Sequence, residues 1–573
     1  MIGSLFSLVF FGLIIWGIVS IAKRFTRGSD EPGDATVSFR RLFIYLLLLA
    51  ALAIAATGIE QLLEILFDRS QTIAGDDTAR QARGFAFLLI GGPSYVLLFR
   101  HVTSRLRVDP TEETSAGWRI YLNATLGISL ITAMATLAEV IRAVFDVSDY
   151  SAAALASGLV ATGVWLFHWF GPLQDHPPQS GFHLAVGSLA GLAAIATGIV
   201  LVVLAATDAV YDSFADTALA ETPPADRLWE AVSAFAVGAP VWWWHWLRPS
   251  RRLWDPTLWN GYVVIAGVLA GVLTAVSSLY SIVFGVAVWV FGDRDGASAA
   301  EHFDFLPTAI AFGVTGLVVW AYHAWIYNQV QAGRTEPVRI YEYTMAGVGL
   351  IAAAGGITTL IVAFIQAVGP AAVAGDEGAA NVLIAAVSAL VIGGPLWWLY
   401  WNRIEGHYDA APQAEATSTS RRIYTLALFG VSAIVAFVSL LIVAFIAFED
   451  LFDGKLGGDT ILDARVAIAL TITTGLLTWY HYGIYRRDRN LAESVQPIGP
   501  GRITIIGRLD REHLEALRNG LDGAVRLWER TDATEAWAGD ITELLAQISE
   551  SSDPDVLVLL QGDVLQIVPF RTG

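Results

Sequence analysis

The stretch RIYLNATLGISLITAMATLAEVIRAVFD, residues 119–146, indicates the fold class. It opens on Arg119, closes on Asp146 and is almost wholly apolar between them. As a helix rising 1.5 Å per residue it spans about 40 Å, close to the thickness of a bilayer with its headgroups. Equivalent stretches run from Arg41 to Asp68, from Arg339 to Gln366 and from Arg422 to Glu449. Each predicts a transmembrane helix.

Composition agrees with this prediction. The chain has 573 residues, of which 55% are hydrophobic and 15% charged, and its mean hydropathy is +0.55. Soluble domains carry about 25% charged residues, so an integral membrane protein is expected. The chain has no cysteine, which excludes disulfides, thiolate metal sites, iron–sulfur clusters and cysteine nucleophiles. Only Lys23 and Lys455 are lysines among 35 basic residues, a bias that suggests a GC-rich bacterial genome.

The N-terminal apolar run, Phe6–Ala22, is followed rather than preceded by positive charge, at Lys23 and Arg24. A cleavable signal peptide has its charge before the apolar run. Residues 1–24 are therefore predicted to form an uncleaved signal-anchor helix with its N-terminus outside, and residues 25–39 a cytosolic linker.

Beyond this linker, the apolar runs come in pairs that predict six helical hairpins, and thirteen spans with the anchor helix. The first helix of most pairs opens with a basic residue two positions before an aromatic one, at Arg41, Arg119, Arg339 and Arg422. The second helix carries glycine or alanine, then an aromatic residue four positions later, at Tyr95, Trp165, Trp242, Trp320, Trp397 and Trp479. Such regular spacing indicates internal duplication.

Prolines refine the repeat. Pro93, Pro240 and Pro395 precede the aromatic residue by two positions in alternate hairpins only. The predicted unit is thus four helices, present three times, over residues 40–175, 180–328 and 337–490. With R-x-Y at one helix start and P-x-W-x-x-[HY] at another helix end, the chain resembles a bacterial family of unknown function, common in Chloroflexota, built of tandem four-helix membrane units. The resemblance implies a fold unit but does not indicate an activity.

Loop charge predicts the orientation. Arginines gather in the loops between hairpins, as at Arg248, Arg251 and Arg252, whereas the loops within hairpins are acidic. Basic loops face the cytoplasm, so the chain is expected in a bacterial cytoplasmic membrane with its C-terminus on the cytoplasmic side. The repeated arginines and tryptophans are interpreted as interfacial anchors in contact with membrane lipids. Asp68, Asp146 and Glu449 form an outer acidic girdle, or alternatively a mouth that gathers cations.

Three histidines follow the repeated aromatic residue by three positions: His168, His245 and His323. Paired histidines on facing helices can ligate haem. The equivalent positions, however, hold Leu98, Tyr400 and Tyr482, and exchange with tyrosine suits an interfacial aromatic belt better than an axial ligand. The belt is the favoured interpretation, and no cofactor or metal is expected.

The last segment, residues 501–573, predicts a small α/β domain. Strands are expected at Ile503–Ile506 and Val525–Trp528, helices at Asp510–Asn519 and Asp540–Glu550, and a hairpin over Val556–Phe570. Seven basic and thirteen acidic residues argue against nucleic acid as a partner. Docking of a protein partner is the expected role.

The sequence indicates the architecture more specifically than the function. The chain lacks the Walker loop and the HExxH and GxSxG motifs, and ionisable residues are scarce in the middle of its apolar runs. The favoured hypothesis is a non-enzymatic membrane platform or sensor that presents a cytosolic interaction domain. A transporter or channel for an apolar or weakly polar substrate is the alternative. A haem-binding electron-transfer protein is the least favoured.

Overall fold

The computed structural model describes residues 32–68, 76–171, 181–215, 223–249, 254–294, 296–330, 333–368, 379–494, 500–521, 524–529, 537, 539–551, 553, 555–561 and 564–569. The predicted anchor helix, Phe6–Ala22, lies outside the described residues. The chain divides into two compact parts: residues 1–405 with 431–477, and residues 406–430 with 478–573. Each part is described by itself.

Long helices dominate the chain. They are α2 (Pro32–Phe67), α3 (Asp76–Val108), α4 (Ala116–Val144), α5 (Ala152–Phe170), α6 (Phe182–Ala215), α7 (Pro224–Trp242), α9 (Ala270–Phe291), α11 (Leu306–Val330), α12 (Glu336–Val368), α13 (Ala379–Ala410), α15 (Thr419–Phe452) and α17 (Arg465–Ser494). Short helices precede or join them: η1 (Pro110–Glu112), α8 (Pro256–Gly261), α10 (Ala299–His302), α14 (Pro412–Ala416) and α16 (Gly458–Asp463).

Ten helical segments within the described residues are long and apolar enough to cross a membrane. They contain α2, α3, α4, α5, α6, α9, α11, α12, α13 and α15. Helix α7 begins with Asp226, Arg227 and Glu230, and α17 ends in the charged stretch RRDR at residues 486–489, which lowers their hydropathy. The prediction of a mostly helical chain with helices of membrane-spanning length is confirmed, while insertion in a membrane and the count of thirteen spans stay predictions.

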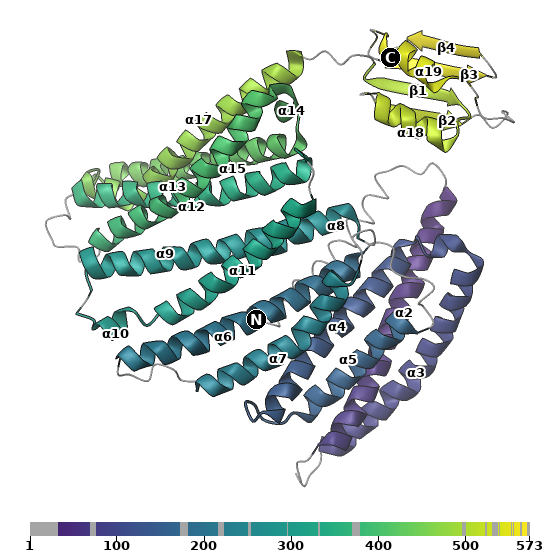
Figure 1. Cartoon of the computed structure of the whole chain (residues 1–573), viewed down its shortest axis with the longest axis horizontal. Coiled ribbons are helices and arrows are strands. Elements are labelled where there is room, and N and C mark those ends of the chain that lie inside the picture. The colour runs from purple at the N-terminus through teal and green to yellow at the C-terminus, as the bar shows by residue number, and fades with distance from the viewer. Residues whose placement is uncertain are drawn as a thin grey trace. The chain divides into compact units, whose positions relative to one another are not determined.

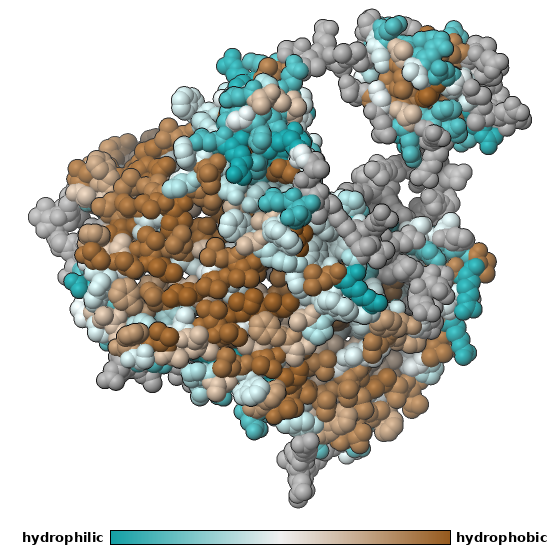
Figure 2. Space-filling model, viewed as in Figure 1, coloured by the Kyte–Doolittle hydropathy of each residue, from teal (hydrophilic) through white to brown (hydrophobic). Residues whose placement is uncertain are grey.

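Helices that follow one another in the chain pack together. Within the first compact part, α2 packs on α3, α4 on α5, α6 on α7 and α9 on α11, as Figure 1 shows. Each pair then contacts the next, through α2 with α5, α4 with α7, and α6 with α11. Contacts that pass from one pair to its neighbour are typical of repeat proteins. Hydrophobic side chains cover the middles of these helices on the face shown in Figure 2.

Small residues bring paired helices into backbone contact. A Cβ on Gly271 of α9 would lie 2.7 Å from the backbone nitrogen of Trp320, and one on Gly316 of α11 would lie 2.7 Å from that of Ala275. Close approach at small residues drives helix association in membranes, where burial of apolar surface cannot. In this pair, the glycine four residues before the repeated tryptophan, Gly316, is therefore a helix-crossing point.

Two segments among the described residues are π-helical. Helix α7 continues into the π-helix η2 (Trp243–Leu247), where the Arg248 N–H donates to the Trp243 carbonyl at 2.9 Å, and α8 continues into the π-helix η4 (Tyr262–Leu269). Both segments adjoin the repeated aromatic positions. Sequence reasoning missed them, because residue types do not distinguish a π-bulge from an α-helical turn.

The C-terminal domain has a four-stranded sheet of order β2-β1-β3-β4, built from β1 (Arg502–Gly507), β2 (Ala524–Glu529), β3 (Asp555–Gln561) and β4 (Val564–Pro569). Strand β1 pairs in parallel with β2 and β3, and β3 pairs antiparallel with β4. Helices α18 (Arg511–Gly520) and α19 (Ile541–Ser549) share a core with alternate strand residues such as Ile505 and Val558. This confirms the predicted α/β segment.

Candidate functional site

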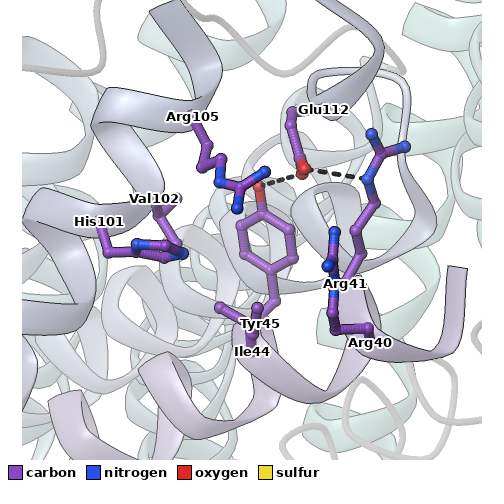
Figure 3. A pocket seen from close by; sticks show the side chains of 8 residues that line it. All are labelled: Arg40, Arg41, Ile44, Tyr45, His101, Val102, Arg105 and Glu112. Carbon is purple, nitrogen blue, oxygen red and sulfur yellow. Dashed lines mark hydrogen bonds and ion pairs between the residues drawn. The ribbon is translucent and has the colours of Figure 1, made fainter. Parts of the chain in front are cut away.

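A cavity of about 230 Å³ opens where α2, α3 and η1 meet. Eight residues line it: Arg40, Arg41, Ile44, Tyr45, His101, Val102, Arg105 and Glu112. Figure 3 shows side chains from the three elements converging on this cavity. Because Arg40 begins the candidate span Arg40–Phe67 and Arg105 lies near the end of Thr78–Val108, the cavity lies at the boundary of two spans.

Arg41 is fixed by η1. Its Nε donates to Glu112 Oε1 at 2.9 Å and its Nη2 to Asp109 Oδ2 at 2.7 Å, while the Tyr45 hydroxyl donates to Glu112 Oε2 at 3.1 Å. Hydrogen bonds from Thr111, reinforced by Arg41, hold the pKa of Asp109 below its usual range. The predicted anchor arginine therefore belongs to a partly buried ion-pair network.

The carboxylate that lines the cavity already has hydrogen-bond partners. Glu112 is 5% exposed and accepts hydrogen bonds on both oxygens. Arg40, Arg105 and His101 line the same cavity and make no ion pair with a described residue. The arrangement is thus rich in cationic donors, and its chemistry suits an anion. Sequence reasoning missed Glu112, although the acidic stretch DPTEE at 109–113 interrupts a basic loop.

The histidines form a second cluster, inside the helix array. His168 Nδ1 lies 2.8 Å from the Val164 carbonyl, so Nδ1 carries the proton and Nε2 accepts. Tyr121 Oη lies 2.8 Å from Nε2 and Tyr95 Oη lies 3.2 Å from it. The second predicted repeat has the same arrangement, with His323 Nε2 3.5 Å from the Tyr262 hydroxyl. In the third, the hydroxyls of Tyr341 and Tyr400 lie 3.1 Å apart.

The three histidines of the predicted interfacial belt are enclosed by the helix array. His168, His245 and His323 are 3%, 1% and 0% exposed, so their rings pack against neighbouring helices, while their depth in the membrane stays a prediction. The His245 ring lies against Gly187, Trp165 and Trp169, which leaves no room for a Cβ at Gly187. Local sequence could not reveal this, because the glycines that admit the His245 and His323 rings, Gly187 and Gly267, lie on other helices.

The predicted tryptophan anchors have two environments. Trp165, Trp242, Trp320 and Trp397 are half-buried, and Trp242 Nε1 donates to the Tyr262 hydroxyl at 2.9 Å. Trp479 is 75% exposed. Arg248 stacks on Trp244, 3.7 Å from the ring centroid, at the end of the helical segment that contains Trp242. Whether these side chains contact lipid stays a prediction.

The other predicted anchors lie at helix ends. Arg119 and Arg339 are half-buried, Arg422 is exposed, and Arg339 pairs with Glu336 at 2.9 Å. The acidic residues Asp68, Asp146 and Glu449 are exposed where α2, α4 and α15 end. They come from helices far apart in the chain, and their outer location stays a prediction.

The second compact part contains a buried ion pair that sequence analysis missed. Arg421, next to the predicted anchor Arg422, is 0% exposed and its Nε donates to Asp488 Oδ2 at 2.6 Å. Tyr408 receives the guanidinium on its ring face, 4.4 Å away. His481, not Tyr482, is the buried residue here, and it packs edge-on against Tyr424. The predicted register is therefore wrong by one position.

Two apolar cavities lie at the junctions of predicted repeats. One, of about 400 Å³, is lined from α4, α5 and α7, and the other, of about 320 Å³, from α9, α11, α12 and α13. Their lining residues correspond at one spacing within each helix. The spacing is 142 residues between α4 and α9, for Leu130 with Val272, Ala133 with Ala275, Met134 with Val276 and Leu137 with Leu279, and 155 residues between α5 and α11, for Thr162 with Leu317 and Trp165 with Trp320. Thr162 Oγ1 and Trp320 Nε1 are buried without a hydrogen-bond partner among the described residues.

Ten apolar helical segments among the described residues, with successive helices packed in pairs in the first compact part, are typical of a polytopic membrane protein. The model of a domain of unknown function, DUF5671, matches residues 41–150, 182–322 and 339–476, and the chain belongs to this family. The three matches confirm the predicted threefold repetition. No curated protein and no solved structure matches the chain.

Proposed function

We propose that this protein is a non-enzymatic membrane platform that presents its C-terminal domain to a cytosolic protein. Six hairpins and the anchor helix form thirteen spans in a bacterial cytoplasmic membrane, with the N-terminus outside and the C-terminal domain inside. The basic loops between hairpins and the scarcity of ionisable residues at mid-span support this placement.

One observation carries the proposal: on the face of the sheet opposite the two helices, apolar side chains lie together beside the polar residues Thr504, Arg526 and Asp555. Strand residues alternate between faces, and Ile503, Ile505, Val556 and Val558 share the core with α18 and α19. The opposite face presents Ile506 beside Trp528 and Leu559, with Leu557 beside Val568. Trp528 is 56% exposed on the edge strand β2.

An exposed tryptophan on an apolar surface is typical of an interface anchor. The domain is too acidic to favour nucleic acid or anionic lipid, so the proposed partner is a protein with a complementary apolar surface. The edge position of β2 also leaves its backbone available for strand pairing.

The test compares Trp528→Ser with Arg518→Ser, an exposed change on the helix-covered side. Full-length protein purified from its host in mild detergent is weighed by native mass spectrometry. The proposal expects a stoichiometric complex that survives Arg518→Ser and is lost with Trp528→Ser. A lone chain in the unchanged protein, or equal complexes in both variants, would refute it.

A second candidate function is binding or transport of an apolar molecule with one polar group. The two junction cavities favour it, because each combines an apolar lining with an unpaired polar atom, Thr162 Oγ1 or Trp320 Nε1. Such a combination suits amphipathic small molecules. Pro240 lines the first cavity, and its missing N–H leaves the carbonyl of Ala236, another lining residue, without its helical donor.

Leu279→Trp fills the second cavity, whereas Leu273→Trp changes a similarly exposed residue of α9 that does not line it. The expected result is loss of a co-purifying apolar molecule with Leu279→Trp alone, measured by native mass spectrometry. Equal retention in both variants would contradict this candidate.

A further inference from the structure

The cavity between α2, α3 and η1 carries an inference independent of the platform proposal. It lies where the candidate spans Arg40–Phe67 and Thr78–Val108 meet at their charged ends. A residue at the boundary of a membrane span lies at the depth of lipid headgroups. A ligand in this cavity is therefore reached from the headgroup layer or from the adjacent water.

The charged side chains of the cavity that remain available to a ligand are positive. Glu112 forms an ion pair with Arg41 at 2.9 Å and accepts a hydrogen bond from the Tyr45 hydroxyl at 3.1 Å. Arg40 and Arg105 then remain as two guanidinium groups facing the cavity, and His101 adds a further donor. Figure 3 shows Arg40 and Arg105 on opposite sides of Tyr45, from α2 and α3.

Positioning also distinguishes this cluster from scattered surface arginines. Arg41, held at 2.7 Å by Asp109 and 2.9 Å by Glu112, fixes the start of α2 against η1, and Val102 of α3 is 2% exposed beneath the cavity. Arg40 and Arg105, which make no ion pair with a described residue, therefore extend from elements whose relative placement is set by buried contacts. Preorganised guanidinium groups are the preferred donors to phosphate, because their planar fork binds two oxygens at once.

We infer that this cavity binds a phosphate group, with Arg40 and Arg105 as its principal ligands and His101 as an additional donor. The phosphate belongs to an anionic phospholipid or to a soluble phosphate ester, which present the same chemistry. At 230 Å³ the cavity holds several groups the size of a water molecule, enough for a phosphate and its first substituent.

The experiment measures retention of phosphatidylglycerol by the full-length protein in detergent, using native mass spectrometry, with phosphatidylcholine and glycerol 3-phosphate as separate probes. The variant Arg40→Gln/Arg105→Gln is compared with Arg100→Gln/Arg107→Gln. The control pair removes the same charge from exposed positions of α3 outside the cavity. Arg40→Lys/Arg105→Lys keeps the charge and removes the fork.

We expect Arg40→Gln/Arg105→Gln to weaken phosphatidylglycerol retention tenfold or more, the control pair to change it less than threefold, and the lysine variant to lie between them. Preference for phosphatidylglycerol over glycerol 3-phosphate identifies the lipid as the source, and the reverse preference identifies a soluble ester. Equal losses in the two glutamine variants would show general surface attraction and overturn the inference. Unchanged retention of every probe would overturn it as well.

Discussion

The Tyr121 hydroxyl and the His168 imidazole show how a single polar pair stabilises a membrane helix pair. His168 Nδ1 is committed to the Val164 carbonyl at 2.8 Å, so Tyr121 donates to Nε2 across the pair α4 and α5 at 2.8 Å. Without these bonds a buried imidazole would be an unpaired polar group in an apolar surrounding, which is costly. The histidine is therefore part of the packing and not an open ligand.

Tyr121→Phe tests this pair. The change leaves the ring in place and removes the 2.8 Å bond, while Tyr95 still lies 3.2 Å from Nε2. We expect the free energy of unfolding to fall by about 1 kcal/mol, the usual net worth of a buried hydrogen bond. Equilibrium unfolding in mixed micelles measures it. Tyr482→Phe, at a residue 46% exposed, is the control and should change stability little. Equal effects would contradict the assigned bond.

At the scale of the element, the crossing glycines decide how closely paired helices approach. Gly393 and Gly394 are neighbours on α13, yet a Cβ on Gly393 would lie 2.5 Å from the Ala353 nitrogen, whereas one on Gly394 would meet nothing within 4 Å. The same residue type thus has a packing role at one position and none at the next.

Gly393→Val should destabilise the protein by about 1–3 kcal/mol, because the added side chain must separate α12 from α13. Gly394→Val should be nearly neutral. Thermal unfolding of both variants in the same detergent measures the difference. Similar melting temperatures for the two variants would show that the crossing tolerates a wider separation.

Helix α19 offers a pH-dependent test in the C-terminal domain. Hydrogen bonds from the Thr542 N–H and side chain to Asp540, the first residue before the helix, hold the pKa of Asp540 below its usual range. A carboxyl group with a lowered folded-state pKa stabilises the fold above its unfolded pKa. That contribution is lost as the pH falls through the folded-state pKa.

Asp540→Asn keeps the cap but does not titrate, whereas Asp540→Ala removes it at every pH. Hydrogen exchange of the α19 amides, corrected for intrinsic rates, should therefore show less protection in the alanine variant at pH 7. The difference in protection between the unchanged protein and the alanine variant should shrink toward pH 3. Protection in the asparagine variant should depend least on pH. A deficit independent of pH would argue against a role for the charge.

At the scale of the whole molecule, orientation is the property most directly open to experiment. The chain contains no cysteine, so single cysteines introduce a label without background. An impermeant maleimide added to intact cells should label Asp146→Cys, and should label Arg486→Cys only after the cells are permeabilised. The opposite pattern would reverse the proposed topology, and labelling of both in intact cells would refute it.

Repetition also has a consequence at this scale. Successive helix pairs contact mainly their neighbours, so each junction between repeats recreates the same surroundings, as the matched linings of the two apolar cavities show. The differences lie in single residues: Thr162 in one cavity corresponds to Leu317 in the other. Related sites with different polar groups can bind different molecules.

The sequence by itself determined the membrane class, the threefold repeat and the α/β segment, because apolar length, motif spacing and strand alternation are local properties of the chain. It located Arg41 and His168 at helix ends but did not identify the residues that surround them. Only the tertiary structure decided that Glu112 pairs with Arg41, that Gly187 and Gly267 admit histidine rings, and that Arg421 is buried against Asp488. These contacts join separate elements, and their geometry depends on how the helices cross, including the two π-helices that shift the register.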